Sequence, residues 1–288
     1  MSKQLNETNI PLSIITVNLN NRDGLKKTID SIVAQTYQDF EWIVIDGGST
    51  DGSKELIEEN QSHITYWISE PDKGIYNAMN KGLSHVHGEY VNFMNSGDVL
   101  YNRTTLEELF NNQLTGDLIY GDWIEQENKK YTHYYSPKEA TLDFFYSANI
   151  CHQATFIKST IMKKYSFNEK YKIVADWEIW IKMLLDGYSM QYVQQTICIF
   201  DANDGLSSIK DTKLMDERNI MRDNTIPPFF LSVLQDNYRM KNIVKYIDNS
   251  QLSINDLIFF RWHTKLTKIV KFCIKILSYF VNMRNHGQ

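Results

Sequence analysis

The strongest constraint on the fold is the segment Glu41–Ser53, in which a strand pattern is followed directly by an acid and a glycine-rich turn. Its apolar run, Ile43–Ile45, is typical of a parallel strand covered on both faces. Asp46 follows where that strand would leave the sheet, and the two glycines after it permit backbone angles closed to other residues. A helix is expected over residues 54–59. Because ligands of open α/β sheets bind beyond the carboxyl ends of the strands, this turn predicts a binding site.

Further strand and helix patterns alternate along the first half of the chain. A helix is predicted at about residues 23–34, and strands are predicted at Leu12–Asn18, Ile64–Ser69, Tyr90–Met94, Asp117–Trp123 and Tyr131–Tyr135. This alternation predicts an α/β fold with a largely parallel, Rossmann-like sheet and flanking helices.

The turn after the third predicted strand offers a phosphate site. In Glu70–Leu83, Pro71 would end the strand and Gly74 would open a helix. The first turn of a helix presents unpaired N–H groups and a partial positive charge, which suit a phosphate. Lys73 is therefore either a partner of a diphosphate or a solvated surface lysine.

The turn after the fourth predicted strand, Asn95–Asp98, contains a single acid, Asp98. Mg²⁺ and Mn²⁺ prefer oxygen ligands, and a carboxylate at a strand end suits them. The alternative is a structural aspartate that caps a helix near residues 104–110.

The Ile45–Gly52 segment resembles the signature of family 2 glycosyltransferases, enzymes of the GT-A fold. The resemblance implies that Asp46 holds the base of a sugar nucleotide, although the family usually has a second acid where this chain has Gly47. It also places Thr16 and Asn18 beside the base. The usual proline before the threonine is absent, and strand-end capping is the alternative role of both residues.

The resemblance extends to the later turns. The segment from Gly74 to Gly82 is similar to the family's donor-binding helix, and residues 95–98 occupy the place of its metal motif. That motif commonly has two or three acids with a serine among them. Here Asn95 and Gly97 replace acids, so the resemblance implies Asn95 as a donor contact and Asp98 as the ligand of Mn²⁺ or Mg²⁺. Metal would then bind weakly without the donor's diphosphate.

A deeply packed helix is predicted from the spacing of apolar residues in Val174–Leu184, and Asp176 lies at its start. In the family, an acid at this place before an aromatic residue is the general base. An aspartate suits that role because it accepts the acceptor hydroxyl's proton as the new bond forms. A helix cap is the alternative.

His152 and Gln153 form a His-Gln pair. Related sequences have such a pair near the acceptor, where His152 would contact a phosphate or a sugar hydroxyl. A structural histidine is the alternative.

Composition excludes several classes of protein. With 288 residues, 42% hydrophobic and 13% aromatic, the chain can bury the core of one large domain, alone or with an appendage. Its three cysteines lie far apart, which favours reduced thiols in a cytosol over a disulfide or zinc framework. The polar residues 1–9 do not resemble a signal peptide, and no run of 18 apolar residues offers a membrane span. A cytoplasmic protein is expected.

The last part of the chain differs in charge from the rest. Residues 257–288 contain six Lys and Arg and no acid, which gives this segment a net charge of +6. Because the whole chain has a net charge of −5, residues 1–256 have a net charge of −5 − 6 = −11. An acidic body does not suit nucleic-acid binding. Lysines and apolar residues recur on separate faces of residues 256–282, which predicts a basic amphipathic helix lying on a membrane. Packing on the catalytic domain, or on a second copy in a homodimer, is the alternative.

These features predict an inverting glycosyltransferase. Its donor would be a nucleotide sugar, in particular a UDP-sugar, and its acceptor a saccharide hydroxyl, lipid-linked in the synthesis of a bacterial surface polysaccharide such as O-antigen or capsule. Residues 1–225 would form the GT-A domain, with a donor half at about 10–125 and an acceptor half at about 126–225. Residues 226–288 would form a helical extension that contacts the inner face of the membrane.

Two other classes of protein share parts of this pattern. An NAD-dependent oxidoreductase is disfavoured because Asn18–Asn21 stands where a G-x-G-x-x-G turn would follow the first strand. A non-catalytic nucleotide-sugar-binding scaffold stays open because the metal motif is reduced to Asp98. The presence of Asp176 argues against it, since donor binding needs no base.

Overall fold

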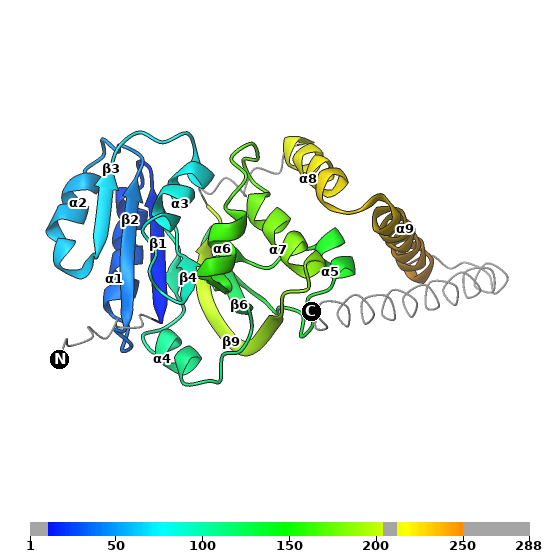
Figure 1. The fold of residues 1–288 in the computed structure, drawn as a ribbon, viewed down its shortest axis with the longest axis horizontal. Coiled ribbons are helices and arrows are strands. Elements are labelled where there is room, and N and C mark those ends of the chain that lie inside the picture. The colour runs from blue at the N-terminus through cyan, green and yellow to red at the C-terminus, as the bar shows by residue number, and fades with distance from the viewer. Residues whose placement is uncertain (1–10, 204–211, 250–288) are drawn as a thin grey trace, which may run out of the picture. The chain divides into compact units, whose positions relative to one another are not determined.

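The computed structural model describes residues 11–203 and 212–249. The chain divides into two compact units, Met1–Met221 and Arg222–Gln288. The first contains a nine-stranded sheet in the order β3-β2-β1-β4-β8-β6-β9-β5, with β7 paired to β6 (Figure 1). Helices flank this sheet, so the predicted α/β fold is confirmed.

Four parallel strands form the first half of the sheet: β3 (Tyr66–Ser69), β2 (Phe40–Asp46), β1 (Leu12–Asn18) and β4 (Tyr90–Phe93). β1 and β2 are in register along their whole length, so Asn18 lies opposite Asp46 at their carboxyl ends. The edge predicted to bind a ligand therefore has two polar side chains next to each other.

Helices cover both faces of these strands. α1 (Arg22–Val33) and α2 (Ser53–Glu59) bury apolar side chains on one face, in a cluster that includes Leu25, Ile29 and Trp42. α3 (Ile75–Leu83) packs on the opposite face, where a Cβ on Gly82 would come within 2.7 Å of Ile15 Cγ2. Gly82 therefore allows a close approach of α3 to the sheet.

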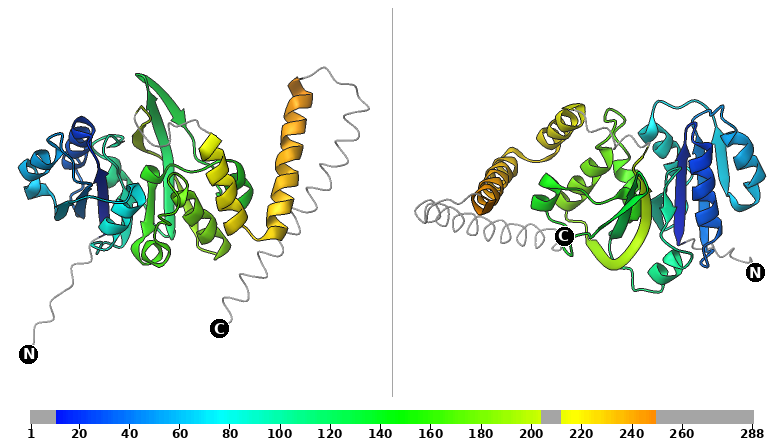
Figure 2. Two further views of the ribbon diagram at one scale, coloured as in Figure 1. Left: turned by 90° about the horizontal axis from the view of Figure 1, so that it is seen from above. Right: turned by 180° about the vertical axis from the view of Figure 1, so that it is seen from behind.

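The second half of the sheet is mixed. β8 (Thr155–Lys158) is antiparallel to β4 and to β6 (Leu118–Glu127), whereas β9 (Met190–Asp201) is parallel to β6 and antiparallel to β5 (Val99–Leu100). The prediction of a largely parallel sheet is thus wrong for this half, because apolar periodicity indicates strands but not their direction. Figure 2 shows β9 as a long, curved strand.

The remaining elements complete the two units. β7 (Lys130–Tyr134) forms a hairpin with β6, and the other elements of the first unit are α4 (Thr105–Phe110), α5 (Leu142–Ser147), α6 (Ser159–Tyr165), α7 (Ala175–Leu185) and the short 3₁₀ helices η1 (Gln61–His63) and η2 (His152–Ala154). α8 (Thr212–Thr225) crosses the boundary between the units, and α9 (Pro228–Asn249) belongs to the second.

The predicted basic helix at residues 256–282 lies outside the described residues, and the domain boundary at residue 225 stays a prediction. Within residues 11–203 and 212–249, no helix is long and apolar enough to cross a membrane.

A buried glutamate forms hydrogen bonds at the amino ends of β1 and β2. Glu41, 3% exposed, accepts hydrogen bonds on Oε1 from Ser13 Oγ (2.5 Å), His87 N (2.5 Å) and Gly88 N (3.1 Å), and its Oε2 lies 3.1 Å from His87 Nδ1. Burial alone raises the pKa of Glu41, but these hydrogen bonds outweigh it and lower the pKa below the usual value. Glu41 is therefore a structural carboxylate away from the ligand-binding edge.

Candidate active site

Asp46 is the centre of a hydrogen-bonded cluster at the carboxyl ends of β1, β2 and β3. Its side chain is fully buried. Oδ1 accepts from Asn18 Nδ2 (2.7 Å) and Ser49 Oγ (2.5 Å), and Oδ2 accepts from Ser49 N (2.9 Å) and Ser69 Oγ (2.6 Å). Burial by itself raises the pKa of Asp46, but the bonds from Ser49, Ser69 and Asn18 prevail and lower it. An ionised Asp46 thus orders the glycine-rich turn.

The structure brings Asn18 to this cluster but does not bring Thr16. The Thr16 side chain is fully buried, and its hydroxyl accepts a hydrogen bond from Trp42 Nε1 (3.0 Å). Thr16 therefore lies within the core, two residues before the end of β1. A nucleotide base could reach it only if this part of the core became exposed.

A carboxylate from another turn fills the space beside Gly47. A Cβ at Gly47 would lie 2.4 Å from Asp72 Oδ2, while Asp72 Oδ1 accepts from Gly74 N (2.8 Å). The acid that the family usually carries at position 47 is thus matched in space by Asp72. Gly74 has a φ of +117° and is the N-cap of α3, so a helix opens here as predicted.

Lys73 is exposed, and the ion pairs of the described residues do not include it.

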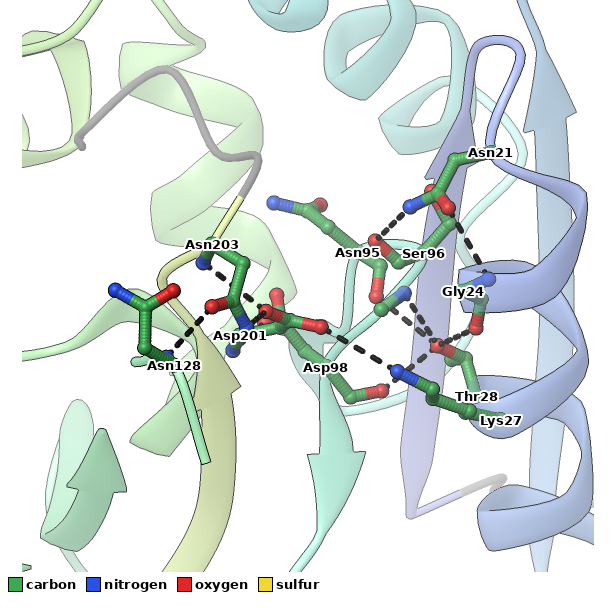
Figure 3. A network of polar contacts seen from close by, with 11 residues as sticks. Asn21, Gly24, Lys27, Thr28, Asn95, Ser96, Asp98, Asn128, Asp201 and Asn203 are labelled. Carbon is green, nitrogen blue, oxygen red and sulfur yellow. Dashed lines mark hydrogen bonds and ion pairs between the residues drawn. The ribbon is translucent and has the colours of Figure 1, made fainter. Parts of the chain in front are cut away.

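The Asn95–Asp98 turn is held by α1 (Figure 3). Thr28 Oγ1 accepts from Gly97 N (3.0 Å) and lies 2.7 Å from Asp98 O, and Asn21 Nδ2 donates to Ser96 O (3.2 Å). Gly97 has a φ of +105°, a conformation that side chains other than glycine rarely adopt. The backbone of the turn is therefore held by the side chains of Thr28 and Asn21.

Asp98 points into the protein. It is 4% exposed, and its two oxygens accept from Gln153 Nε2 (2.6 Å) and Asp201 N (2.9 Å). Burial raises the pKa of Asp98 to about 6. The alternative that Asp98 caps the following helix is wrong, because the N-cap residue of α4 is Thr104. As a metal ligand, Asp98 would have to reach the ion from this enclosed position.

The two residues of the predicted acceptor pair make different contacts. Gln153 is 2% exposed and donates a hydrogen bond to Asp98. His152 instead lies between the two predicted halves of the site, since its Nε2 is 3.1 Å from Asn95 Nδ2 and its Nδ1 is 3.6 Å from Asp176 Oδ2. Because Asn95 Nδ2 is a donor, Nε2 accepts, and the proton of a neutral His152 is on Nδ1, facing Asp176.

Asp176 is the second residue of α7, and Val174 is the N-cap. Asp176 is therefore not the cap residue. Its Oδ1 accepts from Trp177 N (2.8 Å), and Asn149 Nδ2 lies 3.4 Å from its Oδ2. Asp176 is 7% exposed, so a small accessible face remains for an incoming hydroxyl.

Tyr76 connects α3 to the start of α7. Its hydroxyl accepts from Ala175 N (3.2 Å). Burial, with the negative charge of Asp176 nearby, raises the pKa of Tyr76 well above its usual value, so the phenol stays protonated beside the carboxylate.

Sequence patterns did not single out Tyr76, Asn149, Asp72 or Asp201 as site residues. Asp72 and Tyr76 lie inside the Glu70–Leu83 segment that was predicted to bind the donor, so their proximity was a usable signal. Asn149 and Asp201 join the site through the pairing of distant segments, which no local spacing encodes.

The family resemblance implies a divalent cation, and the oxygen atoms at this edge fit one that is shared with a diphosphate. Asn95 Oδ1 is enclosed and accepts no hydrogen bond from the described part of the chain. The Asp201 side chain is 20% exposed at the same turn. In residues 11–203 and 212–249, however, no group of three or more His, Cys, Asp or Glu could hold a metal alone. Phosphate oxygens would have to supply further ligands.

Comparisons with known proteins show the family of the chain. The family model "Glycosyl transferase family 2" matches residues 13–174. A "PGL/p-HBAD biosynthesis glycosyltransferase" of Mycobacterium bovis (strain BCG / Pasteur 1173P2) is 30% identical over 205 residues, covering 68% of this chain and 78% of its own length. An uncharacterized glycosyltransferase of Methanocaldococcus jannaschii is 27% identical over 207 residues, covering 66% and 71%.

Two solved structures share the fold. S. aureus TarS 1–349 in complex with UDP-GlcNAc has a TM-score of 0.61 at 16% identity, covering 78% of this chain and 70% of its own. The mannosyltransferase PcManGT from Pyrobaculum calidifontis, in complex with GDP-Man and Mn²⁺, has a TM-score of 0.58 at 16% identity, covering 88% and 79%. The chain therefore has the GT-A fold, belongs to glycosyltransferase family 2 and is a glycosyltransferase.

Proposed function

We propose that this glycosyltransferase transfers a sugar from a UDP-sugar to a saccharide hydroxyl with inversion at the anomeric carbon. The observation that carries the proposal is the chain of contacts from Asn95 through His152 to Asp176. It connects the end of β4, on the donor side, to a buried carboxylate at the start of α7. Support for a UDP-linked donor comes from the fold shared with TarS, which was solved with UDP-GlcNAc.

In this proposal Asp46 and Asn18 hold the nucleotide base, and Lys73 with the first turn of α3 faces the diphosphate. Asp176 accepts the proton of the acceptor hydroxyl, whose oxygen attacks the anomeric carbon opposite the leaving UDP. One displacement of this kind inverts the anomeric centre. His152 and Asn149 hold Oδ2 of Asp176 in place and leave its charge available for the proton.

Mn²⁺ or Mg²⁺ is part of the proposal. When bound, such an ion would neutralise the charge that develops on the leaving diphosphate. The oxygen atoms around the Asn95–Asp98 turn would hold it together with the diphosphate. PcManGT, which shares the fold, was solved with GDP-Man and Mn²⁺.

A donor screen tests the proposed function against the scaffold alternative. Purified protein with Mn²⁺ is incubated with UDP-Glc, UDP-Gal, UDP-GlcNAc and UDP-GalNAc without acceptor, and released UDP is measured. We expect slow UDP release from at least one donor, because Asp176 can activate water in place of the acceptor. Donor binding without any release would favour the non-catalytic scaffold.

We also propose that the acceptor is a lipid-linked saccharide of a bacterial surface polysaccharide, reached at the cytoplasmic face of the membrane. The support is the sequence of residues 256–282, whose basic groups each contribute about 1 kcal/mol near anionic lipid.

Liposome flotation tests the membrane contact. Full-length protein is expected to float with anionic vesicles at low salt, whereas a chain that ends at Gln251 is expected to stay in the dense fraction. Vesicles of neutral lipid are the control. Equal flotation of both chains would instead favour a tail packed on the catalytic domain or on a second copy.

A further inference from the structure

Asp201 lies against the position at which the Asn95–Asp98 turn lacks an acid. A Cβ at Gly97 would lie 3.6 Å from Asp201 Cβ and 3.8 Å from Asp201 Oδ2. Asp201 is the last residue of β9, more than 100 positions later in the chain. The carboxylate missing from position 97 is therefore matched in space by one from another strand.

The backbone of Asp201 is fixed, while its side chain is partly exposed. Its N–H donates to Asp98 Oδ1 (2.9 Å), and its Oδ1 accepts from Asn203 N (3.1 Å) and Asn203 Nδ2 (2.6 Å). Oδ2 has a looser contact, 3.6 Å from Lys27 Nζ. With the Lys27 side chain 56% exposed, this pair contributes little stability and is readily exchanged.

Asp98 and Asp201 thus differ in what they offer to a ligand. Asp98 is enclosed, and each of its oxygens accepts a hydrogen bond from the protein. Asp201 is 20% exposed, with Oδ2 facing an exposed ammonium group. A hard cation binds to carboxylate oxygens, so it can take the place of the Lys27 ammonium group beside Asp201. Asp201 then has a positively charged partner both before and after the cation binds.

We propose that Asp201, rather than Asp98, is the protein carboxylate that binds the divalent cation carried with the donor's diphosphate. Asp98 then acts as a positioning residue that holds the Asp201 backbone against the turn. This proposal rests on the proposed function, since the cation is the one that accompanies a nucleotide-sugar donor.

Calorimetry of UDP binding with Mn²⁺ and with EDTA tests the assignment. For the unaltered protein we expect Mn²⁺ to tighten UDP binding. Asp201→Asn should lose at least about ten- to a hundredfold of that enhancement, the range typical when groups around a metal site are removed. UDP affinity in EDTA should stay within about twofold, because only metal coordination is lost.

Asp30→Asn is the matched control. Asp30 pairs with Lys26 (2.7 Å) on α1, the helix that carries Lys27, so this variant also removes an exposed lysine–aspartate pair. We expect it to keep the full Mn²⁺ effect. Asp201→Asn should fold normally because the bond to Asp98 comes from its backbone, and an unchanged thermal midpoint verifies this. Asp201→Glu, which keeps a carboxylate, should restore part of the Mn²⁺ effect.

Electron paramagnetic resonance of Mn²⁺ gives a second readout that needs no turnover. The unaltered protein with UDP should reduce the free Mn²⁺ signal below the level that UDP alone gives, whereas Asp201→Asn with UDP should leave it at the level of UDP alone. The assignment is overturned if Asp201→Asn keeps the Mn²⁺ enhancement while Asp98→Asn loses it, or if Mn²⁺ does not change UDP binding to the unaltered protein. No binding of UDP under either condition would instead overturn the proposed function itself.

Discussion

Replacing Asp176 with asparagine is expected to lower the transfer rate by about 10²- to 10⁴-fold, the usual cost of losing a general base. The amide keeps the shape of the side chain, and its oxygen can still accept the bond from Trp177 N. It cannot take a proton from the acceptor hydroxyl. Because His152 lies between Asp176 and the Asn95–Asp98 turn, UDP affinity should stay within a few-fold of the unaltered protein. Steady-state transfer rates and calorimetry with UDP measure the two effects separately.

Glu178→Gln is the matched control for this experiment. Glu178 lies two residues further along α7, is 5% exposed, and pairs with Lys182 (3.0 Å). It is thus another buried acid of the same helix without a contact to His152 among the described interactions. Its substitution should leave the transfer rate within about threefold. If Asp176→Asn turned over as fast as Glu178→Gln, the role of Asp176 would be structural.

Replacing Asp46 with asparagine should weaken UDP binding about a hundredfold, which corresponds to about 2.7 kcal/mol. The carboxylate accepts four hydrogen bonds, and an amide group in its place presents a donor where Asn18 Nδ2 now donates. A hydrogen bond to a charged group contributes about 1.5–3 kcal/mol. The turn after β2 should therefore lose its fixed conformation. Calorimetry with UDP in EDTA measures this effect apart from any metal.

Glu41→Gln separates this local effect from a general loss of stability. Glu41 is also a buried carboxylate of β2 with hydrogen-bonded partners from three residues, about 16 Å along the strand from Asp46. Both variants should lower the free energy of unfolding by about 1–3 kcal/mol in urea titrations. UDP affinity should fall in Asp46→Asn alone. An equal fall in both would show that the affinity follows stability and that Asp46 does not organise the donor site.

Local patterns were sufficient to predict the parallel half of the sheet. Apolar runs predicted β1 and β2. Because the carboxyl ends of parallel strands meet at one edge of the sheet, the Asp46 turn also predicted the edge at which polar residues lie together. The left-handed φ angles of Gly48, Gly52 and Gly74 agree with the use of glycine at these turns.

What could not be predicted depends on contacts between distant segments. Thr16 and Asn18 have the same polar character in sequence, yet the pairing of β1 with β2 places Trp42 against Thr16 and Asp46 against Asn18. The position of Asp201 against Gly97 depends on the pairing of β9 with β5 and β6, and strand direction is not encoded in periodicity. The orientation of Asp98 follows from the same pairing, since its partner is the backbone of Asp201.

The most direct test of the proposed inverting transfer is the anomeric configuration of the first product, followed by proton NMR. The protein is incubated in buffer with Mn²⁺ and the α-linked UDP-sugar from which it releases UDP, and spectra are recorded before the free sugar mutarotates. A single displacement with Asp176 as the base predicts that the β-anomer forms first and that Asp176→Asn forms almost none. Initial formation of the α-anomer would contradict the proposed mechanism.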